Sequence, residues 1–499
     1  DNPGSMRDYR LISLCNVLYK MVSKLLANRL KRVLDKCISE EQSAFMEGRY
    51  ITDNALIAIE IIHALKRKTR GVKGELVLKI DISKAYDKVE WSFLKGVLSK
   101  MGFSERWVQW MMLCVSSVNY SALVNFEKVG PIHPGGGLRQ GGPLSPYLFI
   151  LVAEGLTSLI NKAVANGELH SVKICRGAPS VSRLLFADDC FIFCRSNLSE
   201  TRKLMDILKT YEDASVQEIN LSKSEIFFSR NISRAAQEDL SNLMGVRHVL
   251  GTGTYLGLPS MVGRSKKATF AYIKDRIWRK INYWRSRPLS KVGKEVMIKS
   301  VLQAIPTYVM SIYLLPDSLI NEIERMINAF WWGGGNDNKG IRWLAWDKLA
   351  CSKEEGGLGF RDFQMFNMAM VAKQGWNFII KPTSLVARIF KGRWRIGDGS
   401  NIKVMNEPWL RQEEGRWVES PQSQELIQED KLIWDEESDG VYSVRSGYRK
   451  LMRERDATNR PRGREEWGRI WKIQAPPKAK HFLWRICKRL LTYPDATKK

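Results

Sequence analysis

The spacing of apolar residues predicts helices and short strands over the first part of the chain. Apolar side chains recur at helical intervals over residues 16–38 and 53–68, so we expect two helices there. The apolar run ELVLKID (75–81) predicts a short buried strand, and YSALVN (120–125) predicts another. The chain is therefore expected to begin with a mainly helical segment and to continue with both strands and helices.

A loop rich in Gly and Pro, PGGGLRQGGPLSP (134–146), precedes the longest apolar stretch of the chain. Residues 147–165 show helical spacing, with Ser145 as the expected N-cap and Pro146 at the first helical position. The apolar run in this helix contains Glu154 and stops short of the roughly 18–20 residues that a membrane span needs. We therefore expect no membrane-spanning segment and no membrane partner.

Two adjacent carboxylates interrupt an otherwise apolar stretch, RLLFADDCFIFC (183–194). Two short apolar runs around Asp188 and Asp189 predict a β-hairpin, and Asp81 ends the strand predicted at 75–81. Carboxylates at the ends of neighbouring strands can meet, and their mutual repulsion then requires a neutralising cation. Mg²⁺ takes oxygen ligands and shares its shell with water and phosphates. These aspartates are therefore candidate ligands for ions that assist phosphoryl transfer.

Simpler interpretations of the same residues stay open at this level. An Asp-Asp pair is a common turn, because short polar side chains bond to their own backbone. Asp81 could instead be the N-cap of the helix that follows. The order of the segments favours the metal site, since a strand ending in Asp, a Gly-rich loop before a helix, and an Asp-Asp hairpin occur in succession in a very basic chain.

The charge of the chain indicates a polyanionic partner. It has 79 Lys and Arg against 53 Asp and Glu, a formal net charge of +26 over 499 residues. Such an excess is typical of proteins that bind nucleic acid, and less often of proteins at anionic membranes. Twelve basic and two acidic residues fall within 261–300. The eight cysteines show no CxxC spacing, which indicates reduced thiols in an intracellular protein.

Several segments resemble the motifs of one enzyme family, in the family's own order. The chain resembles the reverse transcriptases of non-LTR (LINE-type) retrotransposons, most closely those of plants. YRLISLCNVLYKMVSKLLANRLK and EEQSAFMEGRYITDN are similar to the family's fingers motifs, YLGLPS to its primer-grip strand, and FWWGGG to its downstream region. The catalytic motifs A to D are matched by KIDISKAYDKVEW, GLRQGGPLSPYLF, RLLFADDC and ASVQEINLSKSE.

The resemblance implies an α+β fold of the right-hand polymerase type. Fingers would occupy residues 1–74, a palm with an antiparallel sheet 75–250, and a basic helical thumb 251–330. A Trp- and Gly-rich connection would follow over 331–411. Residues 412–499 would be an acidic linker and the start of a zinc-binding-like domain that stops before its Cys and His ligands, so we expect no zinc.

The resemblance also implies an activity, the copying of an RNA template into DNA. The enzyme would extend the 3′-hydroxyl of a DNA primer with deoxynucleoside triphosphates, using two Mg²⁺ ions, with Mn²⁺ as an alternative. Asp81 and Asp188 would bind the ions, with Asp189 as the third carboxylate. Lys223 would be the general acid for the leaving pyrophosphate, unless it is an ordinary surface lysine. Action in the nucleus is implied by the family alone.

Residues of a nucleotide site are implied in three places. Tyr86, five residues after Asp81, would exclude a ribose 2′-hydroxyl, although by itself it fits an ordinary buried aromatic. The motif B loop would shape the site and contact nucleotide or template, although its sequence also fits a plain entry loop to a helix. Two fingers arginines would contact the triphosphate. These loop and fingers residues are Arg139, Gln140, Gly141, Pro143, Ser145, Arg10 and Arg49.

The basic segment would bind nucleic acid as the thumb. Its Lys and Arg suit phosphate contacts, whose affinity falls with salt. Trp278 and Trp284 are expected to pack between helices rather than to stack on bases. The basic residues assigned to nucleic acid are Lys274, Arg276, Arg279, Lys280, Arg285, Arg287, Lys291 and Lys294.

Three positions depart from the family pattern and bear on the activity of this copy. Gly142 replaces the aspartate of motif B, and Leu11 replaces a proline of the first fingers motif. Val216 replaces the glycine of motif D, where a β-branched residue resists positive φ. Rival interpretations are a nucleic-acid-binding remnant without polymerisation, a splicing maturase, and an RNA-dependent RNA polymerase. Tyr86 disfavours the last, because a ribonucleotide polymerase must accept the 2′-hydroxyl.

Overall fold

The described part of the computed structural model falls into two units, which are treated separately below. Unit 1 comprises residues 1–261 and 383–401, and unit 2 comprises 262–382 and 402–499. Arg10 and Leu11 lie outside the described residues, and the finer domain bounds given above stay predictions. The structure describes residues 12–249, 253–285, 287, 289–333, 341–394, 433–458 and 468–488.

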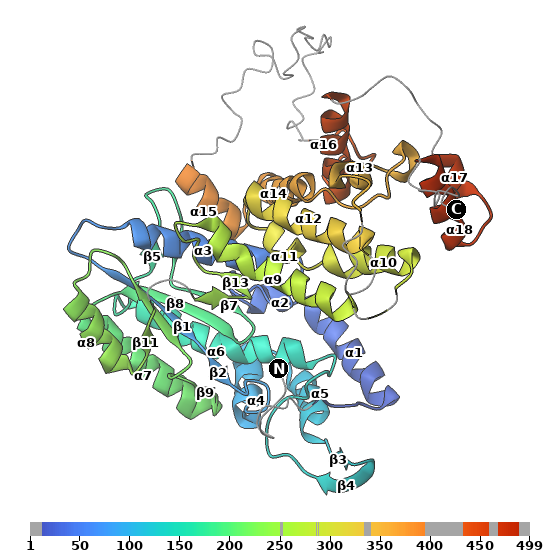
Figure 1. Ribbon diagram of the computed structural model, residues 1–499. Coiled ribbons are helices and arrows are strands. Elements are labelled where there is room, and N and C mark those ends of the chain that lie inside the picture. Colours follow the sequence, from blue (N-terminus) through green and yellow to red (C-terminus); the bar gives the residue numbers. More distant parts are fainter. Residues whose placement is uncertain are drawn as a thin grey trace, which may run out of the picture. The chain divides into compact units, whose positions relative to one another are not determined.

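A five-stranded sheet lies at the centre of unit 1 (Figure 1). In spatial order its strands are β11 (Arg247–His248), β10 (Glu225–Phe228), β1 (Glu75–Ile80), β8 (Asp189–Arg195) and β7 (Arg183–Phe186). Neighbouring strands are antiparallel, apart from the parallel pair β10 and β11. The strand predicted over 75–81 and the hairpin predicted around Asp188 and Asp189 are both confirmed. The sheet therefore brings segments more than a hundred residues apart into register.

Helices pack on both faces of this sheet, which is why β1 is mostly buried. On one face, α6 (Ser145–Ala165) and α7 (Leu198–Ser215) form a core with Leu78. On the other face, α3 (Ile51–Arg67) packs near Val77. Side chains of a strand alternate between its two faces, so the odd-numbered positions of β1 all lie on the α3 side.

The remaining elements of unit 1 follow the predicted order, with two differences. The helix expected over 16–38 is divided at Arg32 and Val33. Ser145 is the first residue of α6 rather than its N-cap. The helix begins one residue before Pro146, which was the expected first helical position, so Leu144 takes the cap position. These elements are α1 (Val17–Lys31), α2 (Leu34–Cys37), α4 (Trp91–Lys100), α5 (Glu105–Ser116), α8 (Arg234–Met244), α15 (Leu385–Trp394), and the strand pairs β2 (Ile82–Ser83) with β9 (Glu218–Ile219), β3 (Tyr120–Val124) with β4 (Glu127–Ile132), β5 (Val172–Lys173) with β6 (Ser180–Val181), and β12 (Thr254–Tyr255) with β13 (Leu258–Pro259).

Helix α6 is longer than the sequence pattern indicated. With 21 residues it is long and apolar enough to cross a membrane by length and composition alone, a test that a buried core helix also passes. The helix is nevertheless mostly buried in unit 1, where Phe149, Leu151 and Ile160 are almost inaccessible. Its apolar character is thus accounted for by the protein core.

Unit 2 is built from helices. Helix α12 packs against α9, and α14 packs against α16. His481 is buried, and its Nε2 lies 2.7 Å from a carboxylate oxygen of Glu295. The elements are α9 (Lys266–Arg285), α10 (Lys291–Met297), a π-helical turn η2 (Ile298–Leu302), α11 (Thr307–Met310), α12 (Asp317–Trp332), α13 (Trp346–Ala350), a 3₁₀ turn η3 (Lys353–Glu355), α14 (Phe363–Ile380), α16 (Val444–Thr458), α17 (Gly468–Lys472) and α18 (Pro477–Cys487).

The residue that ends α7 carries backbone strain. Val216 is the C-cap and adopts φ 59° and ψ 14°, a left-handed conformation that a β-branched residue resists. For an L-residue this conformation costs roughly 1–2 kcal/mol. We expect Val216→Gly to stabilise unit 1 by about 1 kcal/mol, since Gly is the usual residue after a helix and its extra freedom when unfolded offsets part of the gain.

Urea unfolding of unit 1 would measure this effect. Val22 in α1 is a matched control, because it is about as exposed as Val216 but lies inside a helix. Val22→Gly should lower the free energy of unfolding by roughly 0.5–1 kcal/mol. If Val216→Gly also destabilised the protein, strain at this position would have to be rejected.

A carboxyl in unit 2 should make its stability depend on pH. Burial raises the pKa of Glu324 to about 7, although its oxygen accepts a bond from the Phe363 N–H at 3.0 Å. The folded state holds this proton more tightly than the unfolded chain, so the contribution to stability is full below pH 4.5 and is lost as the pH rises through 7. Glu324→Gln keeps the acceptor and should raise the free energy of unfolding by about 2 kcal/mol at pH 8, with no gain at pH 4.

Chemical denaturation at both pH values would check this difference. Glu322, on the same helix, is the control: its bonds to Lys267 and Lys274 lower its pKa. Glu322→Gln should therefore give no gain at pH 8. An equal effect of Glu324→Gln at the two pH values would contradict the proton linkage.

Candidate active site

A tight hairpin presents the adjacent aspartates. Phe186 of β7 pairs with Asp189 of β8, so Ala187 and Asp188 form the turn. Ala187 has a positive φ of 56°, which a residue with a side chain rarely adopts. Its N–H donates to Oε1 of Gln42, at 3.2 Å. A residue distant in sequence therefore fixes the turn from which Asp188 is exposed.

The strand register brings the third carboxylate to the same place. Ile80 pairs with Cys190 across β1 and β8, so the next positions are Asp81 and Asp189. Burial raises the pKa of the Asp189 carboxyl, with Asp188 as the next cause, and Asp81 also raises it while Lys79 lowers it. Asp81 and Asp188 therefore both lie near enough to Asp189 to influence its protonation.

The donor atoms suit a divalent cation, because Mg²⁺ and Mn²⁺ take carboxylate oxygens. In the described ranges, however, no three His, Cys, Asp or Glu side chains are arranged so that they could hold a metal ion. The predicted set of three protein ligands is thus not assembled as the side chains stand. Asp81 and Asp188 could supply part of a shell, and water and phosphate oxygens would complete it, as is usual for Mg²⁺.

A cavity of about 540 Å³ opens beside Asp188 and Asp189, whereas Asp81 is not among the described residues that line it. Its walls include Asp188, Asp189, Lys79 and Tyr86 from the sheet side, and Phe45 from the loop before α3. The β12–β13 hairpin, which matches the predicted primer-grip strand, closes another side with residues 254, 256 and 257. The volume lies in the range of small-molecule sites.

Tyr86 combines the two interpretations that the sequence left open. Its ring stacks on Phe149 of α6, with centroids 4.7 Å apart and planes 15° apart. Burial raises its pKa well above the usual range, with a further increase from Asp188. The same residue lines the cavity. It is thus a packed aromatic whose remaining surface faces the carboxylates.

The motif B loop is anchored to its surroundings rather than placed in this cavity. The Arg139 guanidinium lies 3.8 Å above the ring of Tyr19, and Gln140 donates to Asp87 at 3.0 Å. Gly141 has φ +93°, which favours glycine. Among the described residues that form the cavity wall, none belongs to the predicted loop set of Arg139, Gln140, Gly141, Pro143 and Ser145.

The departure at Gly142 can be judged from the same loop. A Cβ at this position would lie 2.9 Å from the Ser145 hydroxyl and 3.4 Å from Arg139. The hydroxyl belongs to a side chain that can rotate, whereas the backbone of Arg139 is less free. An aspartate here would need a small local shift, so the loop is fitted to the glycine it now carries.

The other predicted contacts are not brought to the cavity. Lys223 is exposed in the loop after β9, where its N–H bonds to Asn220. Nη1 of Arg49 donates to the backbone carbonyls of Ser39 and Gln42, the latter at 2.7 Å. Its guanidinium thus holds the fingers loop together, and the assignment of Arg49 to a triphosphate stays a prediction. Arg10 lies outside the described residues.

Lys79 is a residue of the site that the sequence analysis missed. It lies on β1 two positions before Asp81, and therefore on the same face of the strand. Its Nζ donates to the carbonyl of Thr254 at 2.8 Å and lies 3.9 Å from Glu225. Lys79 thus links the β12–β13 hairpin to the carboxylates and offsets their charge. The sequence did contain a signal for this role, because Lys79 is the one lysine in an otherwise mostly apolar strand.

A buried polar network behind the hairpin was also missed. Residues 41–43 run beside β7, where Gln42 forms a parallel bridge with Leu185. Asn54 of α3 donates to the Leu185 carbonyl at 2.6 Å and accepts from Ser43 at 2.6 Å. Buried polar groups are costly unless bonded, so this network specifies one position for the turn. No sequence pattern indicated it.

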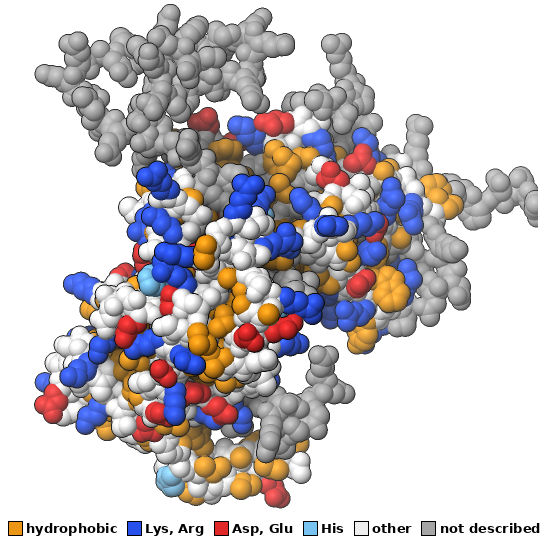
Figure 2. All heavy atoms as spheres, turned by 90° about the vertical axis from the view of Figure 1, so that its left-hand side faces the viewer, with side chains coloured by type: hydrophobic (Ala, Val, Ile, Leu, Met, Phe, Trp, Pro, Cys, Tyr) orange, Lys and Arg blue, Asp and Glu red, His pale blue; other side chains and the backbone are white. Residues whose placement is uncertain are grey.

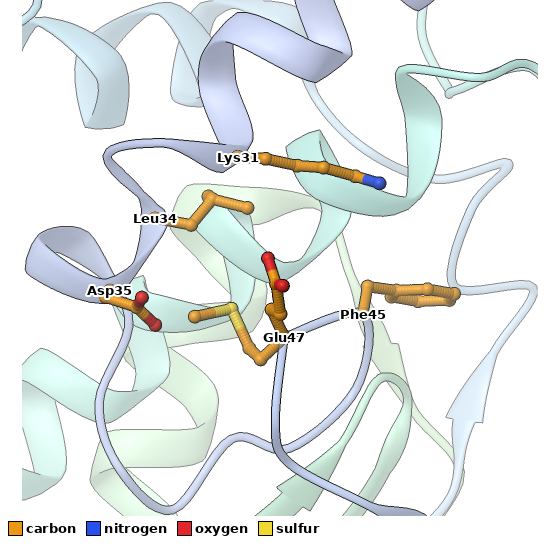
Figure 3. A pocket seen from close by; sticks show the side chains of 6 residues that line it. Lys31, Leu34, Asp35, Phe45 and Glu47 are labelled. Atoms are coloured by element: carbon orange, nitrogen blue, oxygen red, sulfur yellow. The ribbon is translucent and has the colours of Figure 1, made fainter. Parts of the chain in front are cut away.

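A second cavity, of about 400 Å³, lies next to the fingers loop (Figure 3). Lys31, Asp35 and Glu47 give it charged walls, and Leu34 gives it an apolar one. Phe45 lines this cavity as well as the one with the carboxylates.

In unit 2, helix α9 has a buried apolar face and an exposed cationic face. Phe270, Ile277 and Trp284 are buried, whereas Trp278 is 53% exposed. The expected packing is confirmed for Trp284, whose ring lies 6.0 Å from that of Phe330, and is wrong for Trp278. Figure 2 shows Lys and Arg side chains spread over the face that it displays, with fewer Asp and Glu among them. The exposed members of the predicted set are Arg276, Arg279, Lys280, Arg285 and Arg287.

Three lysines assigned to nucleic acid are engaged within unit 2. Lys291 donates to the Trp331 carbonyl at 2.6 Å, and Lys294 donates to that of Gly333. Both bonds satisfy carbonyls at the C-terminal end of α12, where cations are favourable. Burial lowers the pKa of Lys291 to about 7. The assignment of these two lysines to phosphate contacts stays a prediction, because each ammonium already donates to a carbonyl of its own unit. Lys274 pairs with Glu322 at 3.0 Å.

Comparison with known proteins shows which proteins this chain resembles. A putative ribonuclease H protein of Arabidopsis thaliana is 26% identical over 46% of this chain and 50% of its own length. The transposon TX1 uncharacterized 149 kDa protein of Xenopus laevis is 25% identical over 71% of this chain and 26% of its own. The chain thus spans half the length of the first relative and about a quarter of the second.

Two further similarities concern retrotransposons and a solved structure. The Pol polyprotein from the type-1 retrotransposable element R2 of Nasonia vitripennis is 26% identical over 44% of this chain and 20% of its own length. A solved telomerase from Candida albicans, in complex with a fragment of telomeric RNA, covers 77% of this chain and 56% of its own, at 10% identity and a TM-score of 0.37. Residues 1–265, more than half of the chain, match the family described as reverse transcriptase (RNA-dependent DNA polymerase). The chain belongs to this reverse transcriptase family, and its relatives include proteins of LINE-type retrotransposons.

Proposed function

We propose that this chain is the polymerase of a LINE-type retroelement, which extends a DNA 3′-hydroxyl along an RNA template. The observation that carries the proposal is the placement of Asp81, Asp188 and Asp189 at one end of neighbouring strands, where Asp188 and Asp189 line an open cavity. Carboxylates grouped at an exposed strand end are costly to keep unless they serve a charged ligand. In a member of the reverse transcriptase family, that ligand is a nucleotide with its metal ions.

The roles of the protein's own residues follow from where they lie. Asp81 and Asp188 would hold divalent ions, with Mg²⁺ as the expected metal, Mn²⁺ as an alternative and Asp189 as the neighbouring carboxylate. Such ions stabilise charge on the attacking and leaving oxygens of a phosphoryl transfer. Tyr86 faces the same cavity and would meet the sugar of the nucleotide. Lys79 would keep the β12–β13 hairpin, and with it a primer end, at a fixed position relative to the carboxylates.

The cationic face of α9 supports a nucleic acid partner. Arg276, Arg279 and Lys280 are exposed there, and Arg287 lies over the ring of Tyr283 at 4.6 Å. Such a face suits a phosphate backbone, and binding through it would weaken steeply with salt. Trp278, exposed on the same helix, could stack on a base.

Primer extension is the experiment that tests this proposal. The full chain would be given a DNA primer on an RNA template, with either deoxy- or ribonucleoside triphosphates and with Mg²⁺ or Mn²⁺. Extension with deoxynucleotides on RNA supports the proposal, and a preference for ribonucleotides would indicate an RNA polymerase instead. RNA binding that is salt-sensitive but never leads to extension with either metal would identify a remnant that has lost polymerisation.

A further inference from the structure

Phe45 is an exposed aromatic residue in a segment that is otherwise buried. Gln42, Ser43, Ala44 and Met46 are all buried, whereas 45% of Phe45 is exposed. Its φ of +60° lies in the left-handed region that residues with side chains rarely adopt. Strained backbone that persists in a well-packed surrounding is typical of functional sites. The loop therefore holds an apolar ring at the surface at an energetic cost.

The position of this ring is fixed from several sides. Gln42 Oε1 accepts a bond from the Ala44 N–H at 3.0 Å, and Arg49 donates to the Gln42 carbonyl at 2.7 Å. The ring of Phe45 makes an edge contact with Tyr147 of α6, with centroids 6.3 Å apart and planes at 69°. A ligand that met this ring would find it already ordered, which reduces the entropy lost on binding.

The surroundings of Phe45 show what kind of ligand the ring could meet. The cavity that it lines also contains Asp188 and Asp189, which suit the phosphate end of a nucleotide. Figure 3 shows the ring directed away from Asp35 and Glu47, the acidic side chains of the second cavity. Phe45 thus offers an apolar, planar surface to a cavity that also holds two carboxylates.

The other aromatic residues of the catalytic cavity are already packed. Tyr86 is stacked on Phe149, and both Tyr86 and Phe186 pack against the core beneath them. Among the described aromatic residues that line this cavity, Phe45 is the one whose side chain is classed as exposed. A planar exposed ring accepts any nucleobase, because every base has a π-face.

We propose that Phe45 is the stacking platform for a nucleobase at the active site. The inference rests on the proposed function, since the carboxylates must hold a nucleotide for a base to reach the ring. The base belongs either to the template or to the incoming nucleotide, and stacking contributes in the same way to both. Loss of the ring should weaken binding of that base on the order of tenfold.

The test uses 2-aminopurine, whose fluorescence is quenched when it stacks. In one arm it occupies the templating position of an RNA strand annealed to a DNA primer that ends without a 3′-hydroxyl. In the other arm it is supplied as the deoxynucleoside triphosphate. The full chain should quench one of the two probes, and Phe45→Leu should abolish that quenching while Phe45→Tyr restores it. The arm that responds identifies the base.

Phe126 provides a matched control within the same unit. It is also an exposed Phe with positive φ, 69°, but it lies in the turn between β3 and β4. Phe126→Leu should leave the quenching unchanged in both arms, whereas Phe45→Leu should weaken binding of the responding probe about tenfold. The KM for nucleotide rises by this factor if the stacked base is that of the incoming nucleotide. Equal quenching by wild type and Phe45→Leu in both arms would overturn the platform.

The outcome separates this inference from the proposed function. If the wild type extends primers and Phe45→Leu behaves like it in KM and quenching, the platform is rejected and the polymerase stands. If the wild type never extends a primer but quenches the probe through Phe45, the platform stands as a nucleotide-binding contact and the polymerase is rejected.

Discussion

Replacing Asp188 by asparagine is expected to reduce template-directed nucleotide addition by at least about a thousandfold. The substitution keeps the shape of the side chain but removes the negative charge that would hold a metal ion at the tip of the β7–β8 turn. Loss of several kcal/mol of transition-state stabilisation corresponds to a factor of this size. Single-nucleotide extension on an RNA template, followed with a labelled primer, would measure it.

The same substitution should not reduce stability. Asp188 is exposed, and its charge is one of the causes that raise the pKa of Asp189, so removing it relieves repulsion within the folded protein. A loss of activity in Asp188→Asn without a lower melting temperature would therefore locate the effect in the reaction. Asp206→Asn, on the exposed side of α7, is the control and should change neither. Extension that survives in Asp188→Asn would remove this carboxylate from the reaction.

The features that could be predicted from the sequence are those that depend on local patterns. A run of apolar residues that ends in Asp81 specifies a buried strand whatever it pairs with. The two apolar runs around Asp188 likewise specify a hairpin, and their pairing follows once both occur in one core. These inferences needed only neighbours within a few residues.

The features that could not be predicted depend on segments that meet only in the folded chain. The bond from Ala187 to Gln42 joins residues 145 positions apart. Neither Gln42 nor Asn54 belongs to a periodic pattern, because both are polar residues that became buried through tertiary packing. The contacts of the basic segment were unpredictable for a related reason, because a count of lysines does not show that Lys291 and Lys294 cap α12.

Replacing Tyr86 by a small residue is expected to relax the choice of sugar. Tyr86 lines the cavity with the carboxylates and is held by its stack on Phe149, so it cannot move aside for a larger sugar. In Tyr86→Ala the space of the ring becomes available to a 2′-hydroxyl. The preference for deoxy- over ribonucleotides should fall roughly 10–100-fold, the range that steric selection by one pocket wall provides.

The ratio of kcat/KM for the two nucleotide classes is the appropriate measurement. Tyr86→Ala also leaves a cavity against Phe149 and so destabilises the core. A smaller folded fraction lowers both rates equally, however, and leaves their ratio unchanged. Tyr86→Phe keeps the ring and removes only the hydroxyl, so it should retain the full preference if exclusion is steric. If Tyr86→Phe lost the preference to the same degree as Tyr86→Ala, the phenol oxygen rather than the bulk of the ring would select the sugar, and the steric role of Tyr86 would have to be abandoned.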